Sequence, residues 1–244
     1  MRVLLAEPPQ LFLEGAEHTR QVQPLGLGYI GAALAAEHDV RLLLPDTRSY
    51  SGPDPWGEIE RVLVDEAPDV VGITSVTANY PSAAKLAALV KRLNPGVRVI
   101  LGGAHATTEP TAALIGAPDV DYVAQGEGEV TMLELLRELA TARIRTVRHQ
   151  NIPGLYWRDD QGEIHRSAAR PPMTDLDALS FPLRDGLVWS DDIQPAFHQG
   201  IVTMRGCPYR SVFSEIKARL DSYNRTQMNM RLAAAQRETP ISWL

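Results

Sequence analysis

Four short segments of the sequence combine glycine with polar side chains in a way that could hold a ligand. They span residues 25–29, 74–80, 102–106 and 125–129. Glycine lacks a Cβ, so a bulky group can approach its backbone, while hydroxyl, amide and carboxylate side chains form hydrogen bonds. These residue types could hold a bulky ligand that has a polar tail.

The third of these segments looks like the centre of the chain. Residues 97–101 form a short aliphatic run, which is typical of a strand buried on both faces of a parallel sheet. The run ends abruptly in Gly102 and Gly103, followed by His105. Ligands of open α/β sheets bind beyond the carboxyl ends of the strands, so the ligand edge is expected at these two glycines.

The first two segments each have a structural alternative. Gly26 and Gly28 begin a helix after a long polar stretch, but their spacing lacks the third glycine of a dinucleotide fingerprint. Packing of that helix explains them equally well. Thr74, Ser75 and Asn79 could bind a polar ligand tail, or they could form a helix cap and its turn, and the ligand interpretation is the stronger.

The charged and ionisable groups are less specific. His105 has no second histidine, cysteine or carboxylate nearby at the spacing of a zinc site, so we interpret it as a polar contact. Glu127 and Glu129 could accept hydrogen bonds from a ligand, while Glu129 could equally stabilise the positive end of a helix.

The elements that must position these segments alternate along the chain. Short apolar runs at 2–5, 40–44, 69–76, 97–101 and 120–124 predict strands, and amphipathic stretches at 25–37, 55–66, 82–93, 108–116 and 128–140 predict helices. This alternation is typical of βαβ units. The fold class is therefore α/β, a flavodoxin-like or Rossmann-like doubly wound sheet of five parallel strands.

The character of the sequence changes after about residue 145. Residues 154–165 alternate apolar and polar around a turn, which predicts a β-hairpin, and proline-rich residues 170–182 predict an extended linker. A further strand at 200–204 and a C-terminal helix from 214 follow. We therefore expect a ligand-binding domain at 1–145, a hairpin and linker at 146–200, and a separate segment at 201–244.

Composition excludes several classes of protein. The net charge of −6 argues against nucleic acid as a partner. The first residues are too short an apolar run for a signal peptide, and no run approaches the ~20 apolar residues of a membrane span. The single cysteine, Cys207, excludes an internal disulfide and fits a reducing cytoplasm. The sequence leaves the oligomeric state open, including a homo-oligomer.

Taken together, the segments resemble the N-terminal cobalamin-binding domain of B12-binding radical SAM proteins. The resemblance continues through the hairpin and covers about 210 residues in one order. The matching pieces are residues 24–30, 68–75, 101–107, 120–129, 175–179 and 205–209. Each piece is weak alone, and their order makes the resemblance specific.

The resemblance implies a role for each segment. The corrin ring of cobalamin would contact residues 25–29 with Ala104 and His105, and its nucleotide tail would reach the other segments. The cofactor-binding residues expected are Leu25, Gly26, Leu27, Gly28, Tyr29, Thr74, Ser75, Val76, Thr77, Asn79, Tyr80, Gly102, Gly103, Ala104, His105, Ala106, Gln125, Gly126, Glu127, Gly128 and Glu129. His18 does not complete an Asp-x-His-x-x-Gly pattern, so base-off cobalt without a protein histidine is expected.

The sequence departs from the family at the iron–sulfur motif. In these relatives three cysteines spaced Cys-x-x-x-Cys-x-x-Cys hold a four-iron cluster that binds S-adenosylmethionine (SAM). Here Cys207 is followed by Ser211 and Ser214, and hydroxyls are poor substitutes for thiolates on iron. With the few residues that follow, this predicts no [4Fe-4S] cluster, no SAM binding and no radical SAM activity. The serines are either natural or engineered.

Two functions remain for such a chain, with a third as the plain alternative. Cobalamin could support SAM-independent chemistry or methyl transfer on a small-molecule substrate. Alternatively, the chain is a non-catalytic corrinoid carrier, sensor or accessory subunit that binds a partner protein. A flavodoxin-like domain that binds a nucleotide or flavin would share the same sheet and glycines.

Overall fold

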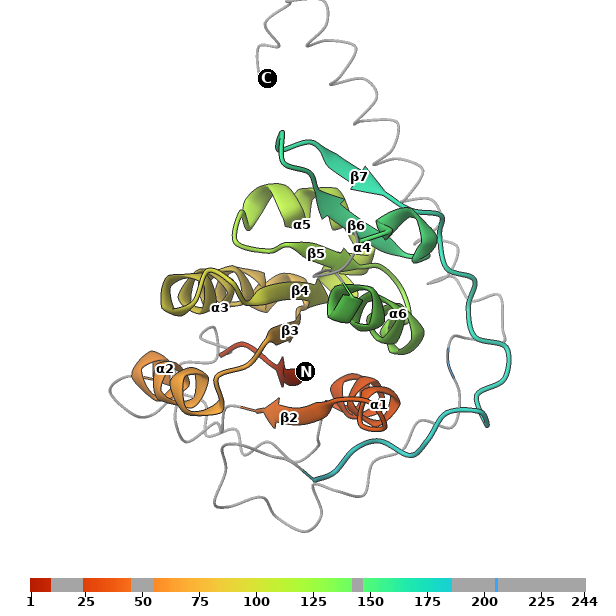
Figure 1. The fold of residues 1–244 in the computed structure, drawn as a ribbon, viewed down its shortest axis with the longest axis horizontal. Coiled ribbons are helices and arrows are strands. Elements are labelled where there is room, and N and C mark those ends of the chain that lie inside the picture. The colour runs from red at the N-terminus through yellow and green to blue at the C-terminus, as the bar shows by residue number, and fades with distance from the viewer. Residues whose placement is uncertain (10–23, 45–54, 142–146, 186–204, 206–244) are drawn as a thin grey trace, which may run out of the picture. The chain divides into compact units, whose positions relative to one another are not determined.

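A computed structural model describes residues 1–9, 24–44, 55–141, 147–185 and 205 of the chain. Met1–Ile201 form one compact unit, in which helices alternate with strands (Figure 1). Among the described residues, no helix is both long and apolar enough to cross a membrane.

The centre of this unit is a seven-stranded sheet in the order β2-β1-β3-β4-β5-β6-β7. Its first five strands are parallel, as the sequence predicts, and their order is the flavodoxin-like one. These strands are β1 (Arg2–Ala6), β2 (Asp39–Leu43), β3 (Val70–Thr74), β4 (Arg98–Gly102) and β5 (Tyr122–Ala124). The chain has a Rossmann-like α/β fold.

Most helices lie where the amphipathic pattern predicts them. They are α1 (Leu25–Leu34), α2 (Pro55–Glu66), α3 (Tyr80–Leu93), α5 (Pro110–Gly116) and α6 (Gly128–Thr141). The short helix α4 (Ala104–Thr108) was not predicted, because five residues are too few to show a helical period. Two 3₁₀ turns, η3 (Thr77–Asn79) and η4 (His149–Asn151), complete the described helical elements.

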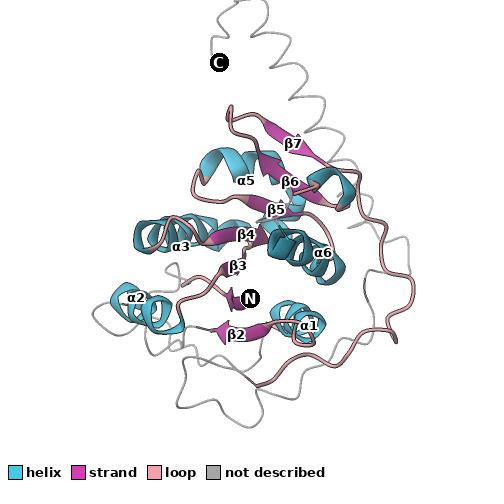
Figure 2. Ribbon diagram, viewed as in Figure 1, coloured by secondary structure: helices cyan, strands magenta, loops and turns pink. Residues whose placement is uncertain are grey.

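Helices cover both faces of the sheet, as Figure 2 shows. Side chains alternate along each strand, so neighbouring residues enter different cores. In β1, Leu4 packs in the core formed with α2 and α3, whereas Leu5 packs in the core formed with α1 and α6. This three-layer arrangement exposes the ends of the parallel strands rather than their faces.

The predicted hairpin is confirmed, and it lengthens the sheet. Strands β6 (Leu155–Arg158) and β7 (Ile164–Arg166) are antiparallel, and β6 pairs with β5 through Tyr122 and Trp157. The turn lies at 159–163, where Gly162 adopts a left-handed φ of 85°. A hairpin signal is local, whereas its attachment to β5 depends on distant residues.

The proline-rich segment differs from the expected free linker, because residues 167–185 are fastened to two helices. The Arg170 Nε–H donates to the Thr131 hydroxyl of α6 at 2.7 Å. Further on, the Leu183 N–H donates to the Gly28 carbonyl of α1 at 2.8 Å. Pro182 is buried. Proline predicts extension correctly but does not reveal these contacts with the core.

Candidate functional site

The predicted ligand segments meet at the carboxyl edge of the sheet. Because β1, β3, β4 and β5 are parallel, their carboxyl ends lie along one edge, and α1 and α6 begin there as well. Gly26, Val76, Thr77, Ala104 and Gly126 are exposed at this edge. Val76 is 47% exposed, which is unusual for a valine following a core strand. An apolar surface beside polar groups suits a large amphipathic ligand.

Two of the predicted glycines have open space where a side chain would lie. No heavy atom lies within 4 Å of an ideal Cβ at Gly26 or at Gly126, leaving out each glycine, its chain neighbours and, at Gly26, its helix backbone. Gly126 also adopts a left-handed φ of 82°, which glycine tolerates best. Packing therefore does not account for these glycines, and a flat ligand face can reach their backbones.

At Gly103 the packing of the protein itself leaves no room for a side chain. Its φ is 94°, and a Cβ there would lie 2.5 Å from the carbonyl oxygen and 2.7 Å from the nitrogen of Ser75. This close approach joins the end of β4 to the loop after β3. At Gly102 a Cβ would meet only the Ala124 carbonyl, at 3.9 Å. The sequence assigned both glycines to a ligand, whereas the fold itself requires the second.

Two predicted polar contacts form hydrogen bonds inside the protein. The buried Ser75 hydroxyl donates to the Gly102 carbonyl at 3.2 Å. The Asn79 side-chain oxygen accepts from the Val76 N–H at 2.8 Å and is also buried. These contacts match the cap-and-turn alternative. Thr74 is half-buried and Thr77 is exposed, so they are the more accessible hydroxyls after β3.

His105 lies among other polar groups of the edge. Its Nδ1 is 3.3 Å from the Thr77 hydroxyl, and its ring centroid is 4.2 Å from that of Tyr80. Burial lowers the pKa of His105, and the nearby Glu109 carboxylate opposes that shift in part. A neutral imidazole is therefore favoured near pH 7. It can accept or donate one hydrogen bond, as expected of a polar contact.

The two carboxylates after β5 have different surroundings. The Glu127 side chain accepts a hydrogen bond from the Met173 N–H at 2.6 Å, which links this loop to the proline-rich segment. Glu129 is only 4% exposed and lies in the first turn of α6. A carboxylate there stabilises the positive end of the helix. The position of Glu129 thus supports its role in stabilising the helix, and Glu127 has a hydrogen-bond partner within the protein.

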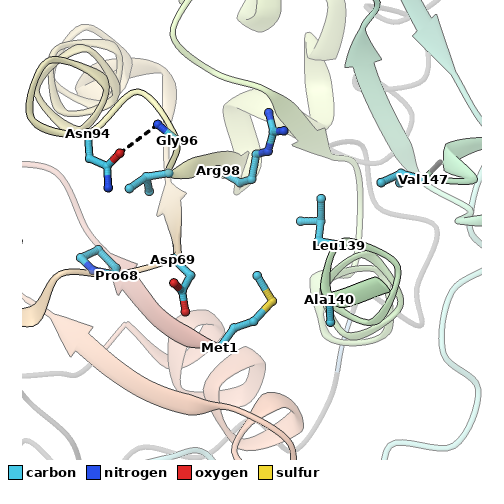
Figure 3. A pocket seen from close by; sticks show the side chains of 10 residues that line it. Met1, Pro68, Asp69, Asn94, Gly96, Arg98, Leu139, Ala140 and Val147 are labelled. Carbon is cyan, nitrogen blue, oxygen red and sulfur yellow. Dashed lines mark hydrogen bonds between the residues drawn. The ribbon is translucent and has the colours of Figure 1, made fainter. Parts of the chain in front are cut away.

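A cavity lies at the opposite, amino edge of the sheet, and Figure 3 shows the residues that line it. It measures about 560 Å³ and is lined by residues including Met1, Asp69, Arg98 and Ala140. Its charges are paired within the protein: Asp69 accepts from the Arg2 N–H at 2.7 Å, and Arg98 lies 3.3 Å from the Asp121 carboxylate. No predicted ligand residue lines this cavity.

A histidine and two carboxylates also meet at the hairpin turn. The ligand atoms of Asp159, Glu163 and His165 lie within 4.8 Å of one another. Asp159 accepts from the Gln161 and Glu163 N–H groups at 3.0 and 2.8 Å, and its other oxygen is 2.6 Å from His165 Nε2. These hydrogen bonds stabilise the hairpin turn, which accounts for the close approach of the three side chains.

Several predicted features lie outside the described residues. They are His18, the strand expected at 200–204, the helix expected from 214, and the degenerate cluster motif of Cys207, Ser211 and Ser214.

The chain is similar in sequence to a known domain family and to several methyltransferases. The family profile described as the B12 binding domain matches residues 15–136, half of the 244-residue chain. An uncharacterized methyltransferase of Pyrococcus horikoshii is 31% identical over 216 residues, which cover 87% of this chain and 45% of that protein. The cobalamin-dependent radical SAM methyltransferase TokK of Streptomyces tokunonensis is 32% identical over 153 residues, covering 61% of this chain and 22% of TokK.

A solved structure matches the fold. It is OxsB, a cobalamin-dependent S-adenosylmethionine radical enzyme with aqua-cobalamin and S-adenosylmethionine bound, with a TM-score of 0.53 and 19% identity. The match covers 70% of this chain and 22% of OxsB. The chain therefore spans less than half the length of each of these relatives.

Proposed function

The chain belongs to the B12-binding domain family, and from that premise we propose that it holds cobalamin at the carboxyl edge of its sheet. The observation that carries this proposal is the open backbone at Gly26 and Gly126, beside the exposed Ala104. The corrin ring is wide and flat, so it needs a surface from which side chains do not project. The residues present fit that requirement.

The individual contacts follow from the accessibility of each group. Gly26 and Ala104 are exposed and Leu25 and His105 are half-buried, so these residues would lie against the ring, with Gly126 at its border. Leu27, Gly28 and Tyr29 are buried and would support the start of α1 from within the fold. Thr74, Thr77 and Gln125 would offer hydrogen bonds to the tail. Ser75, Asn79 and Gly103 would act indirectly, because their polar atoms or close packing already maintain the edge.

We propose further that the cobalt is base-off, with no histidine of the protein beneath it. The missing Asp-x-His-x-x-Gly pattern supports this. His105 is held beside Thr77 and Tyr80, which suits a polar contact better than a cobalt ligand.

The chain is also proposed to lack a radical SAM site. A single cysteine cannot supply three thiolates, and Ser211 and Ser214 occupy the positions of the other two. When bound, cobalamin would supply cobalt-centred chemistry such as methyl transfer, here without SAM, and the protein would orient and shield it.

A second candidate function is a corrinoid carrier, sensor or accessory subunit. The lone Cys207 favours it, because a partner protein would then provide the cluster that this chain does not. This second function predicts that the chain binds cobalamin but converts no substrate, whereas the first predicts catalysis.

Reconstitution with hydroxocobalamin tests the proposal directly. The purified chain is expected to retain about one corrinoid per protein after gel filtration and to be red, with the visible spectrum of a base-off form. A chain that emerges colourless would refute cobalamin binding, and a yellow protein with a bound flavin would support the nucleotide alternative.

The iron content of the purified chain tests the proposed absence of a [4Fe-4S] cluster. After anaerobic treatment with iron and sulfide, the chain is expected to hold far less than four irons and to leave SAM uncleaved. The double variant Ser211→Cys/Ser214→Cys is the matched control, since it restores the three-cysteine spacing. Cluster assembly by the unaltered chain would contradict the proposed loss.

A further inference from the structure

The short helix α4 contacts the loops on both sides of β4. On one side, the His105 N–H donates to the Ser75 carbonyl after β3 at 3.1 Å. On the other side, Thr107 contacts the loop after β5. The first intrahelical bond, from the Thr107 N–H to the Gly103 carbonyl at 2.9 Å, keeps the two contacts in register. This helix therefore connects three segments of the proposed cobalamin site.

Thr107 makes two hydrogen bonds to the loop after β5. Its hydroxyl accepts from the Gly126 N–H at 3.1 Å, and its carbonyl accepts from the Gln125 side-chain amide at 3.1 Å. The side chain is half-buried, and Thr107 is not among the residues expected from the sequence to touch the cofactor.

Gly126 needs such a restraint more than a packed residue does. It is exposed, has a left-handed φ of 82°, and has no atom within 4 Å of its Cβ position apart from its chain neighbours. Packing therefore does little to fix this conformation. A hydrogen bond to its N–H limits the range of loop conformations, and a loop ordered in advance loses less entropy when a ligand binds.

We propose that Thr107 is a positioning residue of the cobalamin site. It fixes Gly126 and Gln125 in the conformation that receives the cofactor, without touching the cofactor itself. This inference rests on the proposed function, since it concerns the same edge.

Three variants of the full chain test it. Thr107→Val keeps the shape of the side chain but removes the acceptor for the Gly126 N–H, whereas Thr107→Ser keeps the hydroxyl. Thr108→Val is the matched control on the same helix, because the Thr108 hydroxyl donates to the Ala104 carbonyl one turn back, at 2.9 Å, within α4 itself. The readouts are hydroxocobalamin affinity, the visible spectrum of the complex, and amide exchange of residues 125–127 without cofactor.

Thr107→Val is expected to weaken hydroxocobalamin binding about fivefold, as loss of one net hydrogen bond implies. It should also speed amide exchange at 125–127 in the cofactor-free protein. Thr107→Ser and Thr108→Val should stay within about twofold of the parent chain in affinity.

Equal affinity of Thr107→Val and the parent chain would overturn the inference, as would an equal loss in Thr107→Ser or in Thr108→Val. Unchanged exchange at 125–127 in Thr107→Val would also overturn it. If the parent chain retains no corrinoid, the proposed function fails, and the inference fails with it for that separate reason.

Discussion

The two edges of the same sheet differ in what they offer a ligand. At the amino edge there is a cavity of about 560 Å³, with Asp69 and Arg98 on its wall (Figure 3). At the carboxyl edge, Gly26 and Gly126 present bare backbone to open space. The cavity has the volume of a ligand site, yet Asp69 and Arg98 on its wall already have partners in the protein.

The difference indicates that volume alone does not identify a ligand site. Internal ion pairs stabilise the amino edge and leave it little unused binding capacity. The carboxyl edge has glycines that packing does not explain and hydroxyls that remain accessible. Such groups are expected where a ligand completes the structure. The comparison can be tested by substitutions that affect one edge and leave the other unchanged.

Gly103→Ala should have the largest effect. A Cβ would lie 2.5 Å from the Ser75 carbonyl oxygen at a φ of 94°, so both overlap and backbone strain oppose it. We expect a loss of about 3 kcal/mol or more in the free energy of unfolding. Urea unfolding of the cofactor-free protein measures it. A change below about 0.5 kcal/mol would show that the packed junction is not as important as the geometry implies.

Gly126→Ala should affect binding more than stability. Its φ of 82° costs about 1 kcal/mol for alanine, and the added Cβ would project toward the cofactor. We expect hydroxocobalamin affinity to fall about tenfold. Gly162→Ala at the hairpin turn is the matched control, because Gly162 has a φ of 85° and equally open space.

The two alanine variants should lose similar stability, and only Gly126→Ala should lose affinity. Equal affinities would argue that the cofactor does not approach Gly126. Isothermal titration and thermal unfolding of both variants provide the comparison.

Ala140→Trp should leave cobalamin binding unchanged. Ala140 is exposed in α6 and lines the amino-edge cavity, and an indole at this position would partly obstruct that cavity. Affinity is expected to stay within about twofold, because the carboxyl edge is not altered. A much larger loss would move the ligand to the amino edge and reverse the comparison.

Acid sensitivity should be a small effect, and histidines in the short helical elements α4 and η4 contribute to it. Burial lowers the pKa of His105 at the carboxyl edge and of His149 beside β5, and Arg98 lowers the latter further. Glu109 and Glu138 partly oppose these shifts. A histidine with a lowered folded pKa is protonated first in the unfolded state.

Stability should therefore fall as the pH drops from about 6.5 toward the folded pKa values, and it should be constant above that range for these groups. His105→Gln and His149→Gln should each reduce the slope, measured by urea unfolding between pH 7 and 5. An unchanged slope in both variants would assign the acid sensitivity to other groups.

Local patterns in the sequence predicted most of the fold. Apolar runs such as 97–101 predicted buried strands, because β-branched and aliphatic side chains suit a parallel sheet that is covered on both faces. The amphipathic stretch at 82–93 marked α3 correctly, and the turn within 154–165 marked the hairpin. The parallel order then brought the four ligand segments to one edge, as expected of strands joined by right-handed crossovers.

The sequence by itself determined the family, through the order of its motifs, and the five parallel strands, through their periodicity, and it predicted the carboxyl edge as the ligand site. Only the tertiary structure decided the roles of residues within that edge. Gly103 and Gly126 look alike in the sequence, yet one meets Ser75 and the other meets nothing beyond its chain neighbours. Thr107 lies in a segment that resembles the family, but nothing in the sequence indicated its contacts with Gln125 and Gly126. Contacts between residues distant in the sequence set these roles, and no local pattern encodes which atoms will meet.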